Sequence, residues 1–405
     1  MAVNLSVPGD EQILAIDGVQ VFVGQAGIKK PEHDDLTLIV LNGINSIGAV
    51  FTQNRFCAAP VQIAKQHLAT DAGVRALVIN TGNANAGTGK QGLDDAQLIC
   101  DKVAQQIGCS ASEVLPFSTG VILEPLPVDK IVAALPKVKV VHWPRAAAAI
   151  MTTDTVPKMA SRTVYIDGHK VRFTGIAKGS GMIHPNMATM LGFVFTDAAI
   201  AQPLLQQMVA EVAATSFNAI TVDGDTSTND SFVVVATGKS QLGRIESVAG
   251  KDYLAVKTVL ADLALELAQA IVRDGEGATK FITIDVRNAL TEAEARQVGY
   301  AVARSPLVKT AFYASDPNLG RILCAIGYAG IADLDVAAIK VYLGEVLVAE
   351  NGGRAASYTE EAGQQVMAQN EITVTIDLAR AGAQAKIYTC DLSREYVTIN
   401  ADYRS

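Results

Sequence analysis

The sequence of 405 residues lacks the features that mark membrane-spanning and secreted proteins. It has no run of about 18 uncharged apolar residues, so we expect no membrane-spanning helix. Its first residues lack the basic and apolar regions of a signal peptide. The five cysteines are an odd number without a C-x-x-C pair, which favours a reducing compartment in which they serve as small core residues. We therefore expect a cytoplasmic protein.

The sequence also lacks any block rich in lysine and arginine, and its net charge is −8 at pH 7. An acidic surface repels phosphate groups, so we expect neither nucleic acid nor an anionic membrane as a partner. The five histidines have no paired spacing typical of metal ligands, and we predict no metal site.

The sequence does have a high apolar content, 49%, with 18% charged residues, and this balance argues against disorder. Short β-rich runs alternate with runs of helical period. The predicted strands cover residues 36–41, 76–80, 164–173 (around a turn at 167–168), 192–195, 232–235, 281–286 and 372–376. The predicted helices cover residues 94–106, 203–217, 252–272, 291–302 and 358–369. This pattern predicts an α+β fold of layered sheets and helices. A turn-forming segment at 273–277 places a smaller C-terminal α/β domain at about 280–405.

The segment 178–193 carries the richest chemistry, because polar and glycine-rich residues run directly into an apolar strand near Met190. One interpretation makes Thr189 an ordinary residue at the start of that strand. The other is self-cleavage, in which the Thr189 hydroxyl attacks the Ala188 carbonyl, an ester replaces the peptide bond, and water releases a new N-terminal threonine. The freed α-amine, with a pKa of about 7.7–8.0, then serves as the base for its own hydroxyl.

Two other patterns carry less weight. The sequence Gly87-Thr-Gly-Lys-Gln-Gly92 matches a dinucleotide-binding motif, but residues 81–86 separate it from the preceding strand and spoil the tight turn. We interpret it as a packing loop. His184 follows Ser180 by four residues, but Pro185 places the histidine in a loop, where helical spacing does not apply.

The junction Ala188-Thr189-Met190-Leu191 resembles, without a gap, the cleavage signature of the ornithine acetyltransferase family, which contains glutamate N-acetyltransferases and bifunctional amino-acid acetyltransferases. Seven further motifs of that family occur in order along nearly the whole chain. They are Gly48-Ala-Val-Phe-Thr-Gln-Asn-Arg55, Asn80-Thr-Gly-Asn-Ala-Asn-Ala-Gly87, Ser118-Thr-Gly-Val-Ile122, Met151-Thr-Thr-Asp-Thr155, Arg273-Asp-Gly-Glu-Gly-Ala-Thr-Lys280, Ser315-Asp-Pro-Asn-Leu-Gly-Arg321 and Ile399-Asn-Ala-Asp-Tyr-Arg-Ser405.

The resemblance implies self-cleavage into an alpha chain, 1–188, and a beta chain, 189–405, in an autoprocessing fold that resembles N-terminal nucleophile enzymes. It implies assembly as a heterotetramer of two alpha and two beta chains. The implied activity, in arginine biosynthesis, is ping-pong transfer of acetyl from N2-acetyl-L-ornithine to L-glutamate through acetylated Thr189. Some members also use acetyl-CoA as the donor, which makes it a candidate co-substrate; no other cofactor is implied.

The resemblance also assigns roles to individual residues. Thr119 and Gly120, within an expected Ser-Thr-Gly turn, are implied as the oxyanion hole, where one lost donor costs roughly 3–4 kcal/mol. A plain turn is the alternative. The implied substrate-binding positions are Thr152, Lys178, Thr189, Glu276, Asn400 and Ser405. Lys178 and Glu276 have the charges that a zwitterionic amino acid needs, although a solvated surface charge is the default for either residue alone.

Two other functions remain open. A self-cleaving N-terminal nucleophile aminopeptidase or amidase shares the nucleophile but admits water to the acyl-enzyme. A non-catalytic amino-acid-binding protein has lost the chemistry, and the intact motif around Thr189 argues against it.

Overall fold

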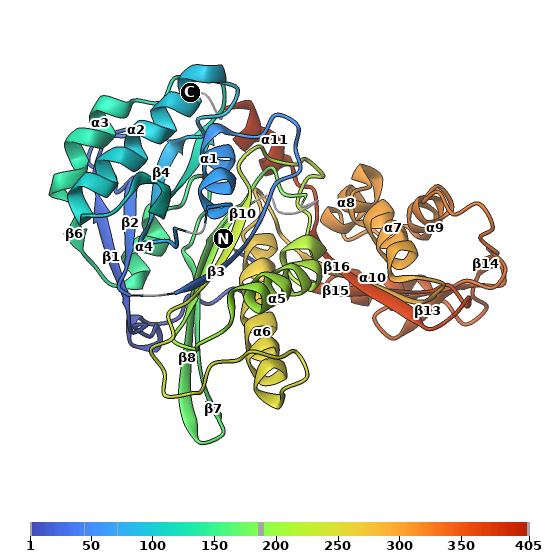
Figure 1. Ribbon diagram of the computed structural model, residues 1–405. Coiled ribbons are helices and arrows are strands. Elements are labelled where there is room, and N and C mark those ends of the chain that lie inside the picture. The colour runs from blue at the N-terminus through green and yellow to red at the C-terminus, as the bar shows by residue number, and fades with distance from the viewer. Residues whose placement is uncertain (1, 44, 71, 185–189, 403–405) are drawn as a thin grey trace. The chain divides into compact units, whose positions relative to one another are not determined.

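The computed structural model describes residues 2–43, 45–70, 72–184 and 190–402 (Figure 1). The chain divides into two compact units. The larger unit contains residues 6–218 and 225–271. The smaller unit contains residues 1–5, 219–224 and 272–405.

The larger unit contains two five-stranded sheets, in the orders β5-β4-β2-β1-β6 and β3-β10-β9-β8-β7. Their strands are β1 (Val19–Gly24), β2 (Leu36–Leu41), β3 (Ser46–Phe51), β4 (Ala76–Asn83), β5 (Val114–Val121), β6 (Lys139–Val140), β7 (Lys158–Ile166), β8 (His169–Lys178), β9 (Leu191–Thr196) and β10 (Ser231–Ala236). The helices are α1 (Ala59–Leu68), α2 (Gly89–Ile107), α3 (Val128–Ala134), α4 (Trp143–Ala149), α5 (Gln202–Thr215) and α6 (Lys251–Arg273). The pairs β4–β5 and β9–β10 are parallel.

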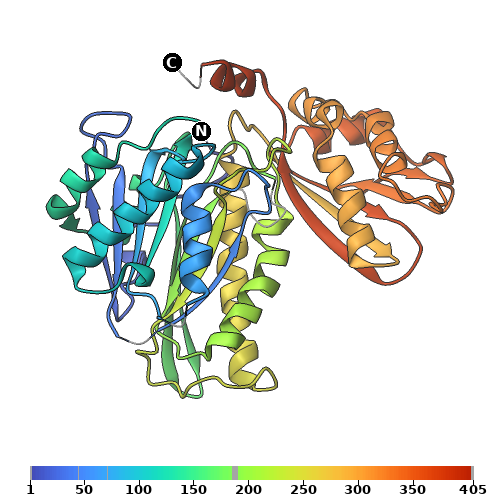
Figure 2. The same cartoon turned by 45° about the horizontal axis from the view of Figure 1, so that its top comes forward.

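The two sheets of the larger unit pack face to face, and helices cover their outer faces. Between the sheets, the Phe117 ring of β5 lies 5.0 Å from the Phe193 ring of β9. Helices α2 and α3 cover the first sheet, whereas α5 lies against β3 and α6 against β8 in the second. Figure 2 shows α5 and α6 together on one side of these strands, in yellow-green and yellow. The layers of the larger unit therefore follow the order helix, sheet, sheet, helix.

Strand β2 shows why the central strands are largely apolar on both faces. Leu36 and Leu38 point to the helix layer, whereas Ile39 and Leu41 point to the other sheet. Because side chains alternate across a strand and both faces are buried here, the strand is apolar except at Thr37. Each predicted strand and helix overlaps an observed element of the same type. The predicted α+β class with layered sheets and helices is confirmed.

The smaller unit has one six-stranded sheet, in the order β14-β13-β12-β15-β11-β16. Its core packs Ile282, Ile284 and Val286 of β11 with apolar residues of α7 and α9. Its strands are β11 (Phe281–Ala289), β12 (Lys340–Leu343), β13 (Val346–Glu350), β14 (Gly353–Arg354), β15 (Glu371–Asp377) and β16 (Ala383–Cys390). Its helices are α7 (Glu292–Ala303), α8 (Pro306–Tyr313), α9 (Leu319–Gly327), α10 (Glu360–Met367) and α11 (Arg394–Ala401).

The cysteines depart in part from expectation. All five are free thiols, and Cys100 and Cys390 are buried as expected, but Cys324 on α9 is exposed and is not a core residue. No helix in the described part of the chain is both long and apolar enough to cross a membrane.

Candidate active site

The end of β5 contains Ser118–Gly120, which the sequence suggested to be a turn. That expectation is wrong, because these residues remain paired with β4, with Thr119 opposite Thr81 and Gly120 opposite Gly82, before the register shifts. Gly120 has a φ of 132°, and a Cβ there would lie 2.2 Å from the carbonyl carbon of Gly82. Only glycine lets the two backbones approach so closely. Such a register shift is a common way to aim groups at a site.

Thr119 is joined to Lys178, the last residue of β8. Both side chains are buried, and Lys178 Nζ donates a hydrogen bond to Thr119 Oγ1 over 3.1 Å. An ammonium group can only donate, so Thr119 Oγ1 accepts this bond and its own hydrogen remains available. The threonine hydroxyl can therefore donate to an oxygen anion beside it, as the predicted oxyanion role requires.

A buried carboxylate connects Lys178 to Thr152. Asp154 Oδ1 accepts hydrogen bonds from Lys158 Nζ (2.6 Å) and from the backbone N–H of Gly179 (2.7 Å), and Oδ2 accepts from the Thr152 N–H (3.1 Å). Burial raises the pKa of Asp154, but the charges of Lys158 and Lys178, together with these hydrogen bonds, lower it by more, to about 2. An ionised Asp154 thus fixes the backbone at Thr152 and beside Lys178.

The sequence indicates no role for Asp154 or Lys158. Asp154 lies in the matched motif Met151–Thr155, and the opposite charges four residues apart were the only signal. That signal is typical of a solvated pair on a helix surface. Here, however, both side chains are fully buried, and Lys158 begins strand β7.

The junction Ala188–Thr189 lies outside the described residues, but the chain on either side of it is held in place. The carbonyl of His184 accepts a hydrogen bond from Thr226 Oγ1 (2.9 Å). The carbonyl of Met190 accepts one from the backbone N–H of Ser231 (2.9 Å). Residues 226–231 therefore contact both flanks of the proposed cleavage site.

The smaller unit brings together two other predicted residues, Glu276 and Asn400. Asn400 Nδ2, on α11, donates to Glu276 Oε2 over 2.7 Å. Glu276 is buried, as is Lys178 in the larger unit, so neither is the solvated surface charge that was the default interpretation. The next residue, Gly277, has a φ of 69°, and a Cβ there would meet Ser393 Oγ at 2.5 Å. The remaining predicted position, Ser405, lies outside the described residues.

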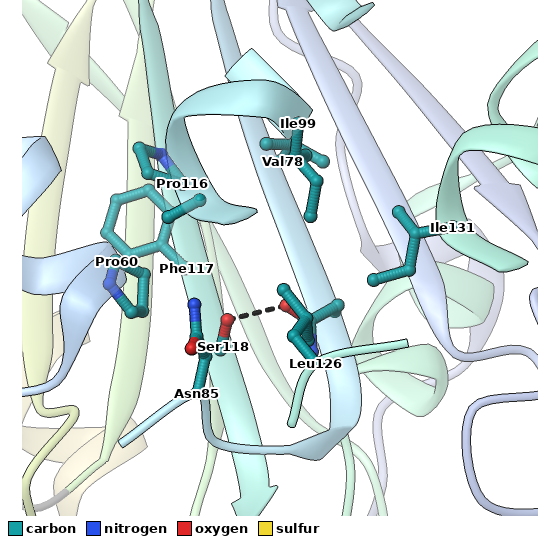
Figure 3. Close-up of a pocket in the computed structure, with 11 residues that line it drawn as sticks. Pro60, Val78, Asn85, Ile99, Pro116, Phe117, Ser118, Leu126 and Ile131 are labelled. Atoms are coloured by element: carbon teal, nitrogen blue, oxygen red, sulfur yellow. Dashed lines mark hydrogen bonds between the residues drawn. The ribbon is translucent and has the colours of Figure 1, made fainter. Parts of the chain in front are cut away.

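A narrow pocket lies behind β5 and is lined by Asn80, Asn85, Ser118 and apolar residues (Figure 3). The Ser118 hydroxyl donates to Asn80 Oδ1 over 2.5 Å inside it. The pocket has room for about one water molecule, which is far too little for an amino acid. It is a small, mostly apolar void beside the strand end rather than a substrate site.

The Gly87–Gly92 loop uses its polar groups internally. Thr88 Oγ1 donates to Asn85 Oδ1 (2.8 Å), and Asn85 Nδ2 donates to the Gly92 carbonyl (2.9 Å). A Cβ at Gly92 would lie 1.9 Å from Thr88 Oγ1. The packing-loop interpretation is therefore right for Gly87 and Thr88 only, because residues 89–92 form the first turn of α2.

Comparisons with known proteins identify one family along nearly the whole chain. The model of the ArgJ family matches residues 20–405. A protein of Neisseria meningitidis named arginine biosynthesis bifunctional protein ArgJ is 66% identical over 406 residues, covering 100% of both chains. Its namesake from Neisseria gonorrhoeae is 65% identical over the same length and coverage. The crystal structure of arginine biosynthesis bifunctional protein argJ from Bacillus halodurans is 37% identical, with a TM-score of 0.50, and covers 53% of this chain and 99% of that one.

Proposed function

The chain belongs to the ArgJ family, and on that premise we propose that it moves acetyl from N2-acetyl-L-ornithine to L-glutamate through an acetyl ester of Thr189. Membership in this family makes the chain an acyltransferase of arginine biosynthesis. The observation that carries the proposed mechanism is the Lys178–Thr119 hydrogen bond, because it leaves the Thr119 hydrogen free for an oxyanion.

The first half-reaction requires self-cleavage at Ala188–Thr189. Thr189 Oγ then attacks the acetyl carbon of N-acetylornithine and passes its proton to its own α-amine. The oxyanion of the tetrahedral intermediate accepts hydrogen bonds from the Thr119 hydroxyl and the Gly120 N–H. The C–N bond breaks, the departing nitrogen takes the proton from the α-ammonium group, and ornithine leaves the acetyl ester behind.

The second half-reaction reverses the proton movements. The amine of glutamate attacks the ester carbonyl, the same donors stabilise the second oxyanion, and Thr189 Oγ regains its proton as N-acetylglutamate leaves. An acetyl-enzyme splits one difficult displacement into two easier ones. The proposed steps call for no metal, because the α-amine of Thr189 carries the proton in both half-reactions.

Substrate recognition is assigned to Thr152, Lys178, Glu276, Asn400 and Ser405. Lys178 has the positive charge and Glu276 the negative charge that the two ends of an amino acid require. Asn400 Nδ2 already bonds the Glu276 carboxylate, which fixes the orientation of that carboxylate. A buried carboxylate held in this way is a strong site for an ammonium group.

We assign the chain to the cytoplasm and its processed form to a heterotetramer of two alpha and two beta chains. Acetyl-CoA is the second candidate donor. Among the described residues the Gly87–Gly92 segment is the one phosphate-binding pattern, and its Thr88 hydroxyl already donates to Asn85 Oδ1 outside the segment. Acetylornithine should therefore be much the better donor.

The test supplies L-glutamate with each donor separately and follows N-acetylglutamate. A bifunctional enzyme makes product from both donors, and a monofunctional one from acetylornithine alone. Product from acetyl-CoA only would contradict the proposal. Hydrolysis of acetylornithine without transfer would instead support a self-cleaving amidase.

A further inference from the structure

Residues 226–231, here called the bridging segment, connect three parts of the larger unit. Thr226 bonds the carbonyl of His184 and Ser231 bonds the carbonyl of Met190, on the two sides of the proposed cleavage junction. In the middle of the segment, Asn229 bonds the strand end that carries Thr119. The segment thus connects residues on both sides of the proposed cleavage junction to the strand that carries the proposed oxyanion hole.

The amide of Asn229 is buried and fully bonded. Its Nδ2 donates to the carbonyls of Ser118 (2.9 Å) and Ala84 (2.6 Å). Its Oδ1 accepts from Thr228 Oγ1 (2.7 Å), which fixes which end of the amide faces the strands. Asn229 is 7% exposed, so water cannot readily replace these partners.

The position of the Ser118 carbonyl gives this contact its significance. That carbonyl belongs to the peptide group whose nitrogen is Thr119 N, so the bond from Asn229 orients the peptide plane leading into Thr119. Ala84 follows β4, and its N–H donates to the Val121 carbonyl of β5 over 2.9 Å. One side-chain amide therefore holds the ends of β4 and β5 on both sides of the close approach at Gly120.

We propose that Asn229 is a positioning residue, which holds the oxyanion donors of Thr119 and Gly120 in place without touching substrate. The inference rests on the proposed function. Asn229 lies after the proposed cut and Ser118 before it, so the same amide joins the two products of cleavage. Oxyanion donors act only when they lie about 2.7–3.1 Å from the developing charge, so a small rotation of the Ser118–Thr119 peptide weakens catalysis.

Self-cleavage and acetyl transfer should respond together. In both reactions Thr189 Oγ becomes the ester oxygen of an acyl group through a tetrahedral oxyanion, so the inference assigns the same donors to both oxyanions. Asn229→Ala should slow the first-order cleavage and lower kcat for transfer, each on the order of 10- to 100-fold. The KM for acetylornithine should change far less, because a misplaced oxyanion donor acts in the transition state.

Asn54 offers a matched control. Its Nδ2 donates to the carbonyl of Thr226 over 2.9 Å, so it is an amide bonded to the same bridging segment but not to β5. Asn54→Ala should leave cleavage and kcat within about threefold of wild type, since it removes one ordinary hydrogen bond from the segment. Equal losses in Asn54→Ala and Asn229→Ala would reduce Asn229 to a merely structural role and overturn the inference.

Thr228→Val provides a second variant if Asn229→Ala does not fold. It keeps both donor bonds of Asn229 but removes the hydroxyl that fixes the amide, and it should lower kcat about fivefold with an unchanged KM. Cleavage is followed by intact mass and transfer by N-acetylglutamate formation, with thermal unfolding as the folding check. Wild-type rates of cleavage and transfer in both Asn229→Ala and Thr228→Val would overturn the inference but leave the proposed function intact. A wild-type protein that neither cleaves nor transfers would overturn the proposed function and the inference with it.

Discussion

Thr119 and Lys178 show how one hydrogen bond can prepare a catalytic donor. Because the Lys178 ammonium must donate, it fixes Thr119 Oγ1 as an acceptor and directs the hydroxyl hydrogen elsewhere. A neighbour able to accept, such as a carbonyl, would have taken that hydrogen instead. Thr81, directly opposite Thr119 on β4, illustrates the contrast, since its hydroxyl donates to the Ala149 carbonyl over 2.8 Å.

Thr119→Ala should therefore lower kcat for acetyl transfer by roughly 10²–10³, with a much smaller change in KM. Thr119→Ser keeps the hydroxyl and should retain most of the activity. The matched control is Thr81→Val, which removes a hydroxyl from the neighbouring strand and should affect stability more than kcat. Steady-state kinetics of the three variants test this, and an effect of Thr119→Ala confined to KM would contradict the oxyanion role.

Asp154 is a second single residue with a predictable role, and its contribution to the stability of the protein should depend on pH. Its folded-state pKa of about 2 lies below the value of about 3.9 for an unfolded aspartate. The ionised carboxylate therefore stabilises the folded protein above about pH 4, and this stabilisation is lost as the pH falls from about 4 through 2. Asp154→Asn leaves the Lys158 charge buried without its partner and should lower the free energy of unfolding by about 3–5 kcal/mol at pH 7.

Urea denaturation of wild type and Asp154→Asn measures the difference in the free energy of unfolding. Asp34→Asn is the control, because Asp34 pairs with the exposed Arg145 at 2.7 Å and should contribute less than about 1 kcal/mol. The gap between wild type and Asp154→Asn should narrow below about pH 4. If Asp154→Asn loses no more free energy of unfolding than Asp34→Asn, the buried Asp154–Lys158 pair does not stabilise the protein as expected.

At the scale of elements, β5 shows where sequence patterns fail. Its sequence contains Pro116 and Gly120, which are typical of turns, and a turn was predicted at residues 118–120, which belong to the strand. The structure tolerates Pro116 because β5 is the edge strand of its sheet, where one row of N–H groups needs no partner. Gly120 is required by the close approach to Gly82 rather than by a turn.

Gly120→Ala should accordingly be far more damaging than an ordinary glycine substitution. The new Cβ would meet the Gly82 backbone at 2.2 Å, so the ends of β4 and β5 must separate. Gly108→Ala is the matched control, since Gly108 has a φ of 74° but nothing within 4 Å of its Cβ position, and should cost about 1–2 kcal/mol. Thermal unfolding and cleavage of both proteins provide the measurement. Similar behaviour of the two would contradict the close-approach argument.

The strands and helices that sequence predicted share one property: a regular apolar pattern with few turn formers. Strands β2, β9 and β10 are buried on both faces, and α6 has a long amphipathic pattern, so local sequence was sufficient. The arrangement of the site was harder to predict from the sequence. Asn229 and Ser118 are 111 residues apart in sequence, and nothing local to either residue indicates the contact. The roles of Thr119, Gly120, Lys178 and Glu276 came from the family resemblance rather than from pattern, and stay predictions here.

At the scale of the whole molecule, the second sheet of the larger unit combines strands from both sides of the proposed cut. Strands β9 and β10 follow Thr189, yet they lie between β3 and β8, which precede it. Six residue pairs join β10 to β3 and six join β9 to β8. A break at residues 188–189 therefore leaves the two fragments interleaved in one sheet.

The cleaved fragments should remain together until the protein unfolds. Size-exclusion chromatography in native buffer should give one species that contains both fragments, whereas denaturing electrophoresis of the same fraction should give two. In urea, the fragments should separate in the same transition in which the tertiary signal is lost, because separation must break the β3–β10 and β8–β9 ladders. Fragments that part in native buffer would contradict the sheet order.

The central claim, that Thr189 is the nucleophile of both cleavage and transfer, is tested most directly by intact mass with and without N-acetylornithine. Wild type should give fragments 1–188 and 189–405, and addition of N-acetylornithine without glutamate should add one acetyl group to the 189–405 fragment only. Glutamate should then remove that acetyl group. Thr189→Ala should remain a single chain and stay unmodified. A Thr189→Ala protein that still splits, or an acetyl group on the 1–188 fragment, would contradict the claim.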